Sequence, residues 1–364
     1  MIITNITSYF TKDKGAYFVK IDTDEGVSGL GECSPMNVRG NCEIIEDYIK
    51  PQLIGQDPLN IVKIEEAVTK KNYKFAGQLS AMAFSGVEIA LWDLKGKYLN
   101  LPVYSLLGGK CREVIEYYGS SMSRDLSPEE EALKVKKAVD EFGFKAVKIK
   151  VGARMGNSTG VIDYEGDIEK VKALRQVLGD KIKIMIDGNS SFTYFQAEQL
   201  FSKIKEYDIY VFEEPCPYFD IDSYVKLAQR ISVPINIGEQ DWNIFTIKEF
   251  IAREACHISA VDVTKCGGFS NARRVAALCK AFGILYAPHN TTRGIGLFAT
   301  AHLVASTPEC AFYQEYSIQG LGDREKYLLN RPVPKNGTTM VPEAPGLGVE
   351  MDLERMEAEM TVVR

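Results

Sequence analysis

The sequence predicts an α/β protein in which a TIM-like barrel of (β/α)8 type follows a smaller α+β domain. Three observations favour this class. From about Val114 onward, short apolar runs typical of strands alternate with amphipathic helical patterns. Charged residues end these runs at a spacing that fits one strand and one helix. The chain has 364 residues, of which 45% are hydrophobic, so it is long enough for two domains.

Residues 1–112 are predicted to form the α+β domain. Runs rich in β-branched and aromatic residues at 2–10 and 15–23 are typical of strands, and the turn DEG leads into a third run at 27–33. The pattern then becomes helical, and residues 82–99 carry apolar side chains at three- and four-residue spacing. Strands followed by helices indicate a small antiparallel sheet covered by helices.

Residues 113–317 are predicted to form the barrel. The strand candidates are the runs 114–120, 146–152, 182–189, 209–215, 234–240, 258–263, 283–290 and 311–317. Helical stretches such as 128–142, 167–178 and 271–282 separate them. A doubly wound sheet is the rival architecture, but no G-x-G-x-x-G motif follows the first strand. The last segment, residues 318–364, does not continue the alternation of strand and helix patterns and is expected to pack back on the first domain.

The composition excludes several classes of protein. A net charge of -6 and a pI near 5.4 argue against a nucleic-acid or membrane-surface binder. The eight cysteines are scattered without metal-site spacing, and we interpret them as reduced thiols. The sequence has no signal-peptide pattern and no long apolar stretch, so we expect a cytoplasmic protein.

From the second strand candidate onward, every strand ends in an ionisable residue. These residues are Lys150, Asp187, Glu213, Glu239, Asp262, His289 and Glu315. Successive members are 37, 26, 26, 23, 27 and 26 residues apart, which is about one βα unit except where residues 152–167 form an insertion. Taken alone, each could be a turn residue, a helix cap or a structural histidine. Together they predict one active site, because the C-terminal ends of barrel strands meet at one mouth.

Two features of this set indicate its chemistry. Three carboxylates on successive strands repel one another unless a cation lies among them, and oxygen ligands without cysteine favour Mg²⁺. The run AVKIKVG places Lys148 and Lys150 on one strand face. An exposed edge strand protected by lysines is the alternative interpretation of this run alone. Across the mouth, a carboxylate at Asp262 would orient the imidazole of His289.

With these residues in place, the chain resembles the enolase superfamily, specifically its mandelate racemase subgroup. The resemblance spans nearly the whole sequence and rests on the motifs ALWDLKGKYLNLPVYSLLGG, KIK, DGN, FEEP, GEQ, DVTKCGG, PHN and PGLGVEMD. It implies a (β/α)7β barrel with an N-terminal capping domain that the C-terminal segment completes. The muconate-lactonising subgroup is disfavoured, because it would have lysine where this chain has Asp262, and Lys265 comes three residues too late.

The resemblance also implies roles for individual residues. The implied acid/base groups are Lys150, His289 and Asp262. The implied ligands of one Mg²⁺ ion per subunit are Asp187, Glu213 and Glu239. The implied partners of the substrate carboxylate are Lys148 and Glu315. Asn189, Ser121 and Arg154 are further candidates for substrate binding, and a solvated loop is the alternative interpretation of Arg154. Mg²⁺ and Lys148 would bind a substrate carboxylate and stabilise the enediolate formed when the neighbouring carbon loses a proton.

We therefore expect a Mg²⁺-dependent dehydratase that converts an acid sugar to a 2-keto-3-deoxy acid. A racemase, epimerase or cycloisomerase acting on a carboxylate is the alternative, since it needs the same acid/base pair. A barrel with only a binding role is disfavoured, because no expected site residue is missing. We expect a small-molecule carboxylate as the partner, and a homo-oligomer between dimer and octamer.

One departure from the family pattern concerns the cover of the site. Members usually carry a closing loop between the first two strands of the capping domain, but here TKDKG leaves only a tight connection. We expect a more open pocket, or one completed by residues 34–42, by the insertion at 152–167, or by another subunit.

Overall fold

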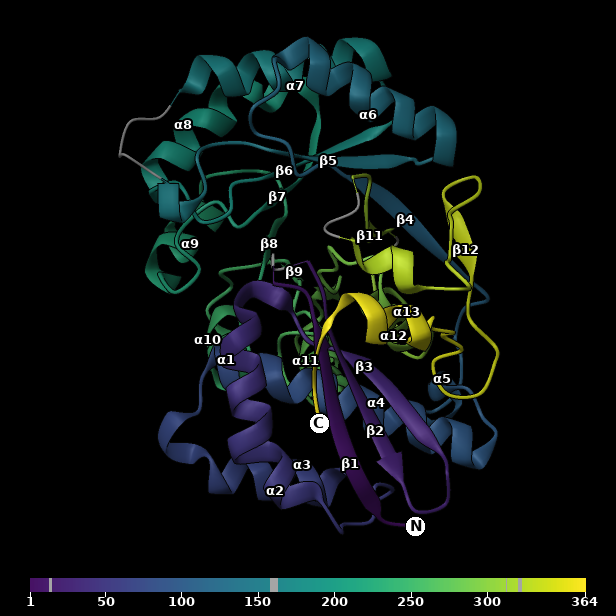
Figure 1. Cartoon of the computed structure of the whole chain (residues 1–364). Helices are drawn as coiled ribbons and strands as arrows, with labels where there is room; N and C mark the ends of the chain where they lie inside the picture. Colours follow the sequence, from purple (N-terminus) through teal and green to yellow (C-terminus); the bar gives the residue numbers. More distant parts are fainter. Residues whose placement is uncertain (13–14, 158–162, 312, 320–322) are drawn as a thin grey trace.

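The computed structural model describes residues 1–12, 15–157, 163–311, 313–319 and 323–364. The N-terminal part is a four-stranded antiparallel sheet in the order β13-β1-β2-β3 with helices on one side (Figure 1). Its elements are β1 (Ile3–Phe10), β2 (Tyr17–Thr23), β3 (Ser28–Glu32), α1 (Val38–Glu43), α2 (Lys50–Leu53), α3 (Ile61–Lys71), α4 (Gln78–Leu99) and α5 (Val103–Leu106).

Helix α4 lies directly against strand β3, and glycines make this contact possible. A Cβ atom on Gly31 would lie 1.9 Å from the carbonyl oxygen of Gly86, and one on Gly29 would lie 2.0 Å from that of Ala90. Only glycine permits such a close approach of two backbones. The contact places the end of β3, with the buried Glu32, over the barrel.

The barrel is a ring of parallel strands with helices on its outside (Figure 1). Its strands are β4 (Val114–Ser120), β5 (Ala146–Lys150), β6 (Lys183–Asp187), β7 (Ile209–Glu213), β8 (Ile235–Ile237), β9 (Ile258–Ser259), β10 (Leu285–Tyr286) and β11 (Tyr313–Ser317). The helices between them are α6 (Pro128–Phe142), α7 (Tyr164–Leu178), α8 (Tyr194–Ile204), α9 (Ile221–Ala228), α10 (Ile244–Ala252), α11 (Phe269–Phe282) and α12 (Ile295–Ala305).

Seven helices thus separate eight strands in the described residues, which is the (β/α)7β arrangement rather than a complete (β/α)8 barrel. The fold class is confirmed. β11 pairs with β4, and a parallel bridge between Tyr286 and Cys310 brings β10 against the segment that leads into β11. The amide of Ala311 donates to the carbonyl oxygen of Tyr286 over 2.8 Å, which closes the ring.

Strands β9 and β10 are shorter than the sequence pattern predicts. Their regular ladder covers two residues each, yet backbone bonding continues beyond it: the amide of His289 donates to the carbonyl oxygen of Ala260 over 3.1 Å. The two chain segments therefore stay parallel as far as the mouth of the barrel. This extension places Asp262 and His289 next to each other.

The C-terminal segment contacts both sheets. β12 (Thr338–Met340) pairs with β4 of the barrel, whereas α13 (Leu353–Glu359) leads into β13 (Thr361–Val363), which pairs with β1. The division at 112/113 and 317/318 remains a prediction.

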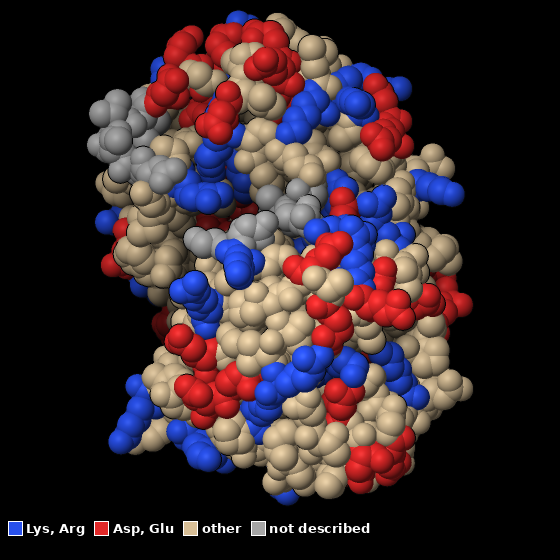
Figure 2. Space-filling model, in the orientation of Figure 1, with Lys and Arg blue, Asp and Glu red and all other residues tan. Residues whose placement is uncertain are grey.

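Figure 2 shows acidic and basic side chains interspersed over the visible face of the molecule. The helices have a separate property: none of those in the described ranges is long and apolar enough to cross a membrane.

Candidate active site

The ionisable residues at the strand ends converge on one buried site. Neighbouring strands are in register here, so that Lys150 on β5 pairs with Asp187 on β6, and Asp187 pairs with Glu213 on β7. All seven residues predicted from the spacing are buried. Seven charged groups buried together require partners or a ligand, because an isolated charge away from water is costly.

Asp187, Glu213 and Glu239 form a group that could hold a metal ion. One carboxylate oxygen from each lies within 4.8 Å of the others. Within the described part of the chain, Oε2 of Glu239 has no hydrogen-bond partner although it is buried. Three convergent carboxylates, one of which has an unsatisfied oxygen, fit a hard divalent cation. The residues present therefore fit the metal that the strand-end pattern predicts.

The electrostatics of this group differ from one carboxylate to the next. Burial raises the pKa of Glu213 to about 7, although the nearby charge on Lys148 opposes this shift. Burial acts in the same direction on Asp187, but Lys150 and Lys148 outweigh it and lower the pKa of Asp187. A cation bound among the three carboxylates would remove the repulsion that favours protonation of Glu213.

The two lysines of AVKIKVG face this group rather than solvent. Nζ of Lys148 lies 2.5 Å from Oε1 of Glu213 and 3.1 Å from Oε1 of Glu315, and Lys148 is 1% exposed. Lys150 donates to Oδ2 of Asp187. The edge-strand interpretation is therefore wrong, because β5 lies inside the ring between β4 and β6.

On the other side of the group stands the pair Asp262 and His289. Nδ1 of His289 lies 2.7 Å from Oδ2 of Asp262, while Oδ1 of Asp262 accepts hydrogen bonds from the amide and hydroxyl of Thr264. Nε2 of His289 lies 3.2 Å from Oε2 of Glu239. Burial opposes a charge on the imidazole, but Glu239, Glu315 and Asp262 outweigh it and raise the pKa of His289.

The predicted substrate-binding residues differ in their surroundings. Glu315 is buried and accepts hydrogen bonds from Oγ of Ser120 and from the amide of Asn290. Asn189 donates from both its amide groups to Asp187. Ser121 is buried directly after β4, and its amide donates to the carbonyl oxygen of Lys148.

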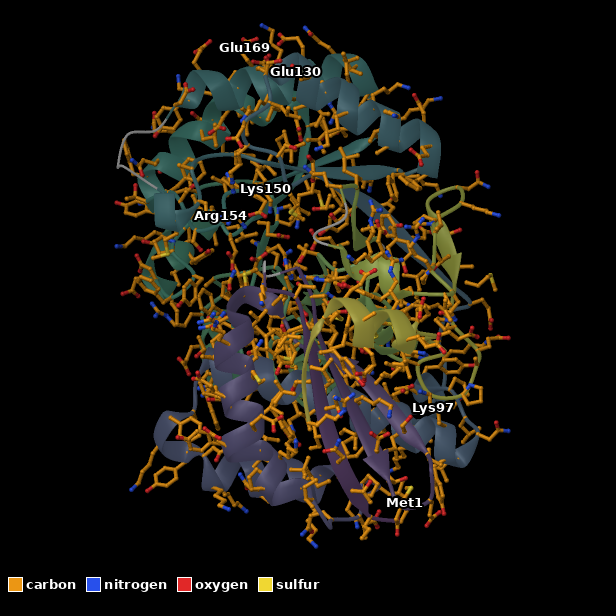
Figure 3. The ribbon with its side chains drawn as sticks, viewed as in Figure 1. Met1, Lys97, Glu130, Lys150, Arg154 and Glu169 are labelled. Atoms are coloured by element: carbon orange, nitrogen blue, oxygen red, sulfur yellow. The ribbon has the colours of Figure 1, made fainter. Side chains whose placement is uncertain are left out.

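Arg154 is exposed and has a positive φ of 54°. Figure 3 shows both Lys150 and Arg154 in the zone between the barrel helices and the capping domain. Residues 158–162 of the insertion and residues 13–14 of the β1–β2 connection lie outside the described residues, so the predicted cover of the site is described only in part.

Three further residues belong to this cluster and were not singled out from the sequence as site residues. Asn236 donates to Oε2 of Glu213, Ser120 donates to Glu315, and Nζ of Lys265 lies 3.9 Å from Oε1 of Glu239. The sequence could have identified Asn236 and Ser120, because a polar residue within an apolar strand run indicates a side chain that has a hydrogen-bond partner inside the barrel. The sequence could not have identified Lys265 in this way, because it follows its strand by several residues.

Two family models together match most of the chain. Residues 5–108 match the mandelate racemase / muconate lactonizing enzyme N-terminal domain, and residues 130–356 match the enolase C-terminal domain-like model.

Two relatives that align with this chain over most of their own length agree with this match. The chain is 32% identical to a D-xylonate dehydratase of Haloferax volcanii, an alignment that covers 94% of this chain and 84% of the relative. It is 31% identical to an arabinonate dehydratase of Saccharolobus solfataricus, over 90% of this chain and 86% of the relative.

A solved structure has the same architecture. It is a mandelate racemase/muconate lactonizing protein from Paracoccus denitrificans PD1222 complexed with magnesium, 28% identical, with a TM-score of 0.93 over 100% of this chain and 99% of that one. The sequence motifs, the barrel with its cap and these matches lead to one assignment. This chain belongs to the mandelate racemase and muconate lactonizing enzyme family of the enolase superfamily.

Proposed function

We propose that this protein is a Mg²⁺-dependent dehydratase that converts an acid sugar to a 2-keto-3-deoxy acid. The observation that carries the proposal is the placement of two proton-transfer groups, Lys150 and the pair Asp262–His289, at the strand ends on either side of one carboxylate cluster. An elimination needs this arrangement, because one group must take a proton while another gives one to the leaving hydroxyl.

The substrate carboxylate is held at the centre of the site. Asp187, Glu213 and Glu239 would hold one Mg²⁺ ion per subunit. When bound, the ion supplies Lewis-acid stabilisation of negative charge on the substrate carboxylate. The ammonium of Lys148, anchored by Glu213 and Glu315, presents a fixed positive charge to the same carboxylate. This charge stabilises the enediolate that forms when the carbon beside the carboxylate loses its proton.

Two residues move protons. Lys150, as the free amine, takes the C2 proton of the acid sugar. His289, as imidazolium, gives the proton on Nε2 to the hydroxyl on C3, which leaves as water when the C3–O bond breaks. Asp262 holds the opposite ring nitrogen and so fixes the orientation of the imidazole. The enol that results tautomerises to the 2-keto-3-deoxy acid.

The names of the relatives support this choice, since both are dehydratases of sugar acids. A racemase, epimerase or cycloisomerase is the second candidate. The same two proton-transfer groups support it, because they can take a proton from one side of a carbon and return one from the other.

A substrate screen tests the proposal. The purified enzyme with Mg²⁺ is incubated with a panel of mono- and diacid sugars, and 2-keto-3-deoxy acids are detected as their semicarbazones. A keto product from at least one sugar acid, and none after Lys150→Met, is expected. Epimer or lactone formation without any keto product on the whole panel would establish the isomerase instead.

Two further proposals concern the setting of the enzyme. We propose that it acts as a homo-oligomer and in the cytoplasm, as the sequence predicts. Light scattering coupled to size-exclusion chromatography measures the first, and a monomer at working concentration would contradict it.

A further inference from the structure

The turn after β9 carries a buried lysine that the proposed mechanism does not use. Lys265 is 2% exposed, and within the described ranges its Nζ has no hydrogen-bond partner. The carboxylate oxygen that faces it is Oε1 of Glu239, at 3.9 Å. An ammonium group buried without a hydrogen bond is costly, so its position calls for a physical explanation.

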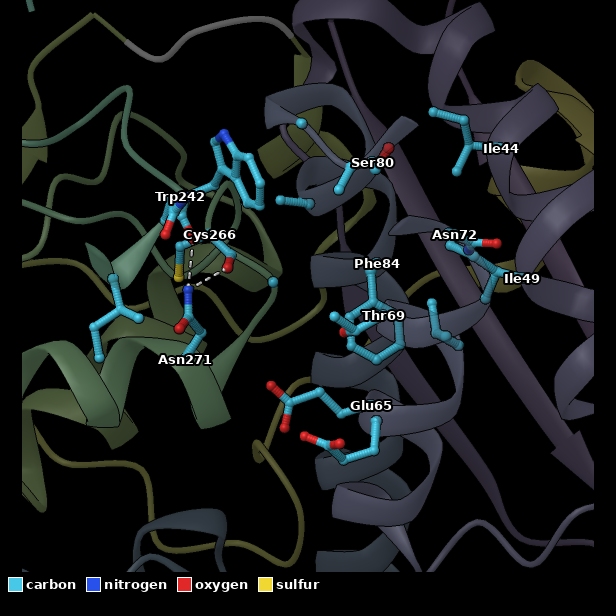
Figure 4. Close-up of a pocket in the computed structure, with 18 of the residues that line it drawn as sticks. Ile44, Ile49, Glu65, Thr69, Asn72, Ser80, Phe84, Trp242, Cys266 and Asn271 are labelled. Carbon is cyan, nitrogen blue, oxygen red and sulfur yellow. Dashed lines mark hydrogen bonds between the residues drawn. The ribbon is translucent and has the colours of Figure 1, made fainter. Parts of the chain in front are cut away.

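The backbone of this turn is held from two sides. The amides of Lys265 and Cys266 both donate to the carbonyl oxygen of Asp262. The amide of Gly267 donates to Oγ of Ser85 on α4 of the capping domain. Asn271 on α11 donates to the carbonyl oxygen of Cys266, next to a cavity of about 240 Å³ between the capping helices and the barrel (Figure 4). Because these hydrogen bonds fix the turn, the side chain of Lys265 has a defined position beside Glu239.

The two oxygens of Glu239 lie in different surroundings. Oε1 accepts a hydrogen bond from the side-chain Nε2 of Gln240 over 2.7 Å and faces Lys265. Oε2 lacks a hydrogen-bond partner and lies on the side of His289. The carboxylate therefore keeps Oε1 toward the side-chain amide of Gln240 and the ammonium of Lys265, and turns Oε2 toward His289.

Lys265 also acts on a fourth carboxylate beside the metal group. Glu214 is buried, with no hydrogen-bond partner for Oε1 among the described residues. Burial raises its pKa well above the ordinary value, and the charge on Lys265 opposes this shift. Lys265 thus offsets negative charge on both Glu239 and Glu214.

We infer that Lys265 is a positioning residue that keeps Oε1 of Glu239 away from the bound cation and so makes the site prefer Mg²⁺ over Ca²⁺. Mg²⁺ demands an octahedral set of single oxygens, whereas Ca²⁺ accepts six to eight oxygens and two from one carboxylate. A carboxylate that can present only one oxygen favours the smaller ion. The inference rests on the proposed function, because it assumes that Asp187, Glu213 and Glu239 bind a divalent ion.

The test is a pair of calorimetric titrations. Metal-stripped full-length protein is titrated with MgCl₂ and with CaCl₂, and the ratio of the two dissociation constants is compared for wild type, Lys265→Met and Lys265→Arg. Lys181→Met is the control, because Lys181 is an exposed lysine in the turn before β6. Lys265→Met is expected to move the ratio at least about tenfold toward Ca²⁺. Lys265→Arg and the control should keep the wild-type ratio.

A purely electrostatic role predicts something different. If Lys265 only repels cations, its removal tightens both ions by the same factor and leaves the ratio unchanged, and that result would overturn the inference. Should the methionine variant not fold, Lys265→Gln, which keeps a polar end without the charge, replaces it in the comparison of the two dissociation constants. Wild-type protein that binds neither ion would defeat the proposed metal site itself. An unchanged ratio in a protein that binds Mg²⁺ defeats only the inference.

Discussion

Nδ1 of His289 and Oδ2 of Asp262 lie 2.7 Å apart although the residues are 27 positions apart in sequence. They follow the parallel strands β9 and β10, whose backbone bonding continues to His289. Because Thr264 fixes the other oxygen of Asp262, the carboxylate cannot rotate without breaking two hydrogen bonds. The pair is therefore preorganised before any substrate binds.

The first prediction concerns this pair. Asp262→Asn keeps the shape, but its amide removes the carboxylate charge beside Nδ1 and so disfavours the imidazolium that must give up the proton on Nε2. Turnover should fall by about 10²–10⁴-fold, as for a misoriented acid/base histidine. Steady-state kinetics at saturating Mg²⁺ measure the loss. Asp180→Asn, an exposed change of the same kind, is the control and should leave turnover unchanged.

The second prediction separates the two proton transfers. His289→Asn cannot shuttle a proton, yet Lys150 remains beside the metal group. The variant should exchange the C2 hydrogen of the substrate with D₂O, while dehydration falls by about 10³-fold or more. Lys150→Met should lose both. Proton NMR of the recovered substrate measures exchange.

Other outcomes of the same experiment are informative. Loss of exchange in His289→Asn would mean that the imidazole takes the proton, as expected for the opposite configuration at C2. Normal turnover by both variants would defeat the assignment of both groups, since the other histidines, His257 and His302, lie outside the cluster.

The third prediction concerns the metal. Chelation should abolish turnover, and Mg²⁺ should restore it. Glu213→Gln should weaken Mg²⁺ binding by about 100-fold or more, because it removes a ligand charge. Glu214→Gln is the matched control: Glu214 is equally buried, but it is not among the three converging carboxylates. Full activity of protein shown to be metal-free by elemental analysis would contradict the prediction.

The fourth prediction concerns stability and pH. Burial lowers the pKa of His302 on α12 to about 4, from an ordinary value near 6.5. The imidazole of His302 therefore binds a proton below about pH 6.5 in the unfolded chain, but only below about pH 4 in the folded chain. Stability should fall through this window by roughly 3 kcal/mol from this residue.

Urea denaturation at pH 7 and pH 4 measures the effect. In the folded chain Nδ1 of His302 accepts from the amide of Tyr104, and Nε2 lies 3.1 Å from the carbonyl oxygen of Leu347. His302→Gln can reproduce an acceptor and a donor without titrating, so its stability should depend less on pH in this range. An identical pH dependence in both proteins would assign the loss to other groups.

Local sequence determined many elements of this protein directly. Helix α6 begins and ends as the sequence predicts, because Ser127 and Glu130 form a capping box and Gly143 adopts the left-handed conformation that ends the helix. The strand-end residues were also predictable. Successive parallel strands, each followed by one helix, return the chain to the same edge of the sheet, so a period of about one βα unit places its polar residues together.

Contacts between distant segments were decided by the tertiary structure alone. The buried carboxylate of Glu32 meets Thr292 and Arg324 only because the capping domain docks on the barrel. Lys265, which the sequence places past its strand, reaches Glu239 because α4 and α11 hold its turn against the site. Periodicity records which face of an element a residue occupies. The closure of the ring and the docking of the cap decide which faces meet, and no local pattern encodes those distances.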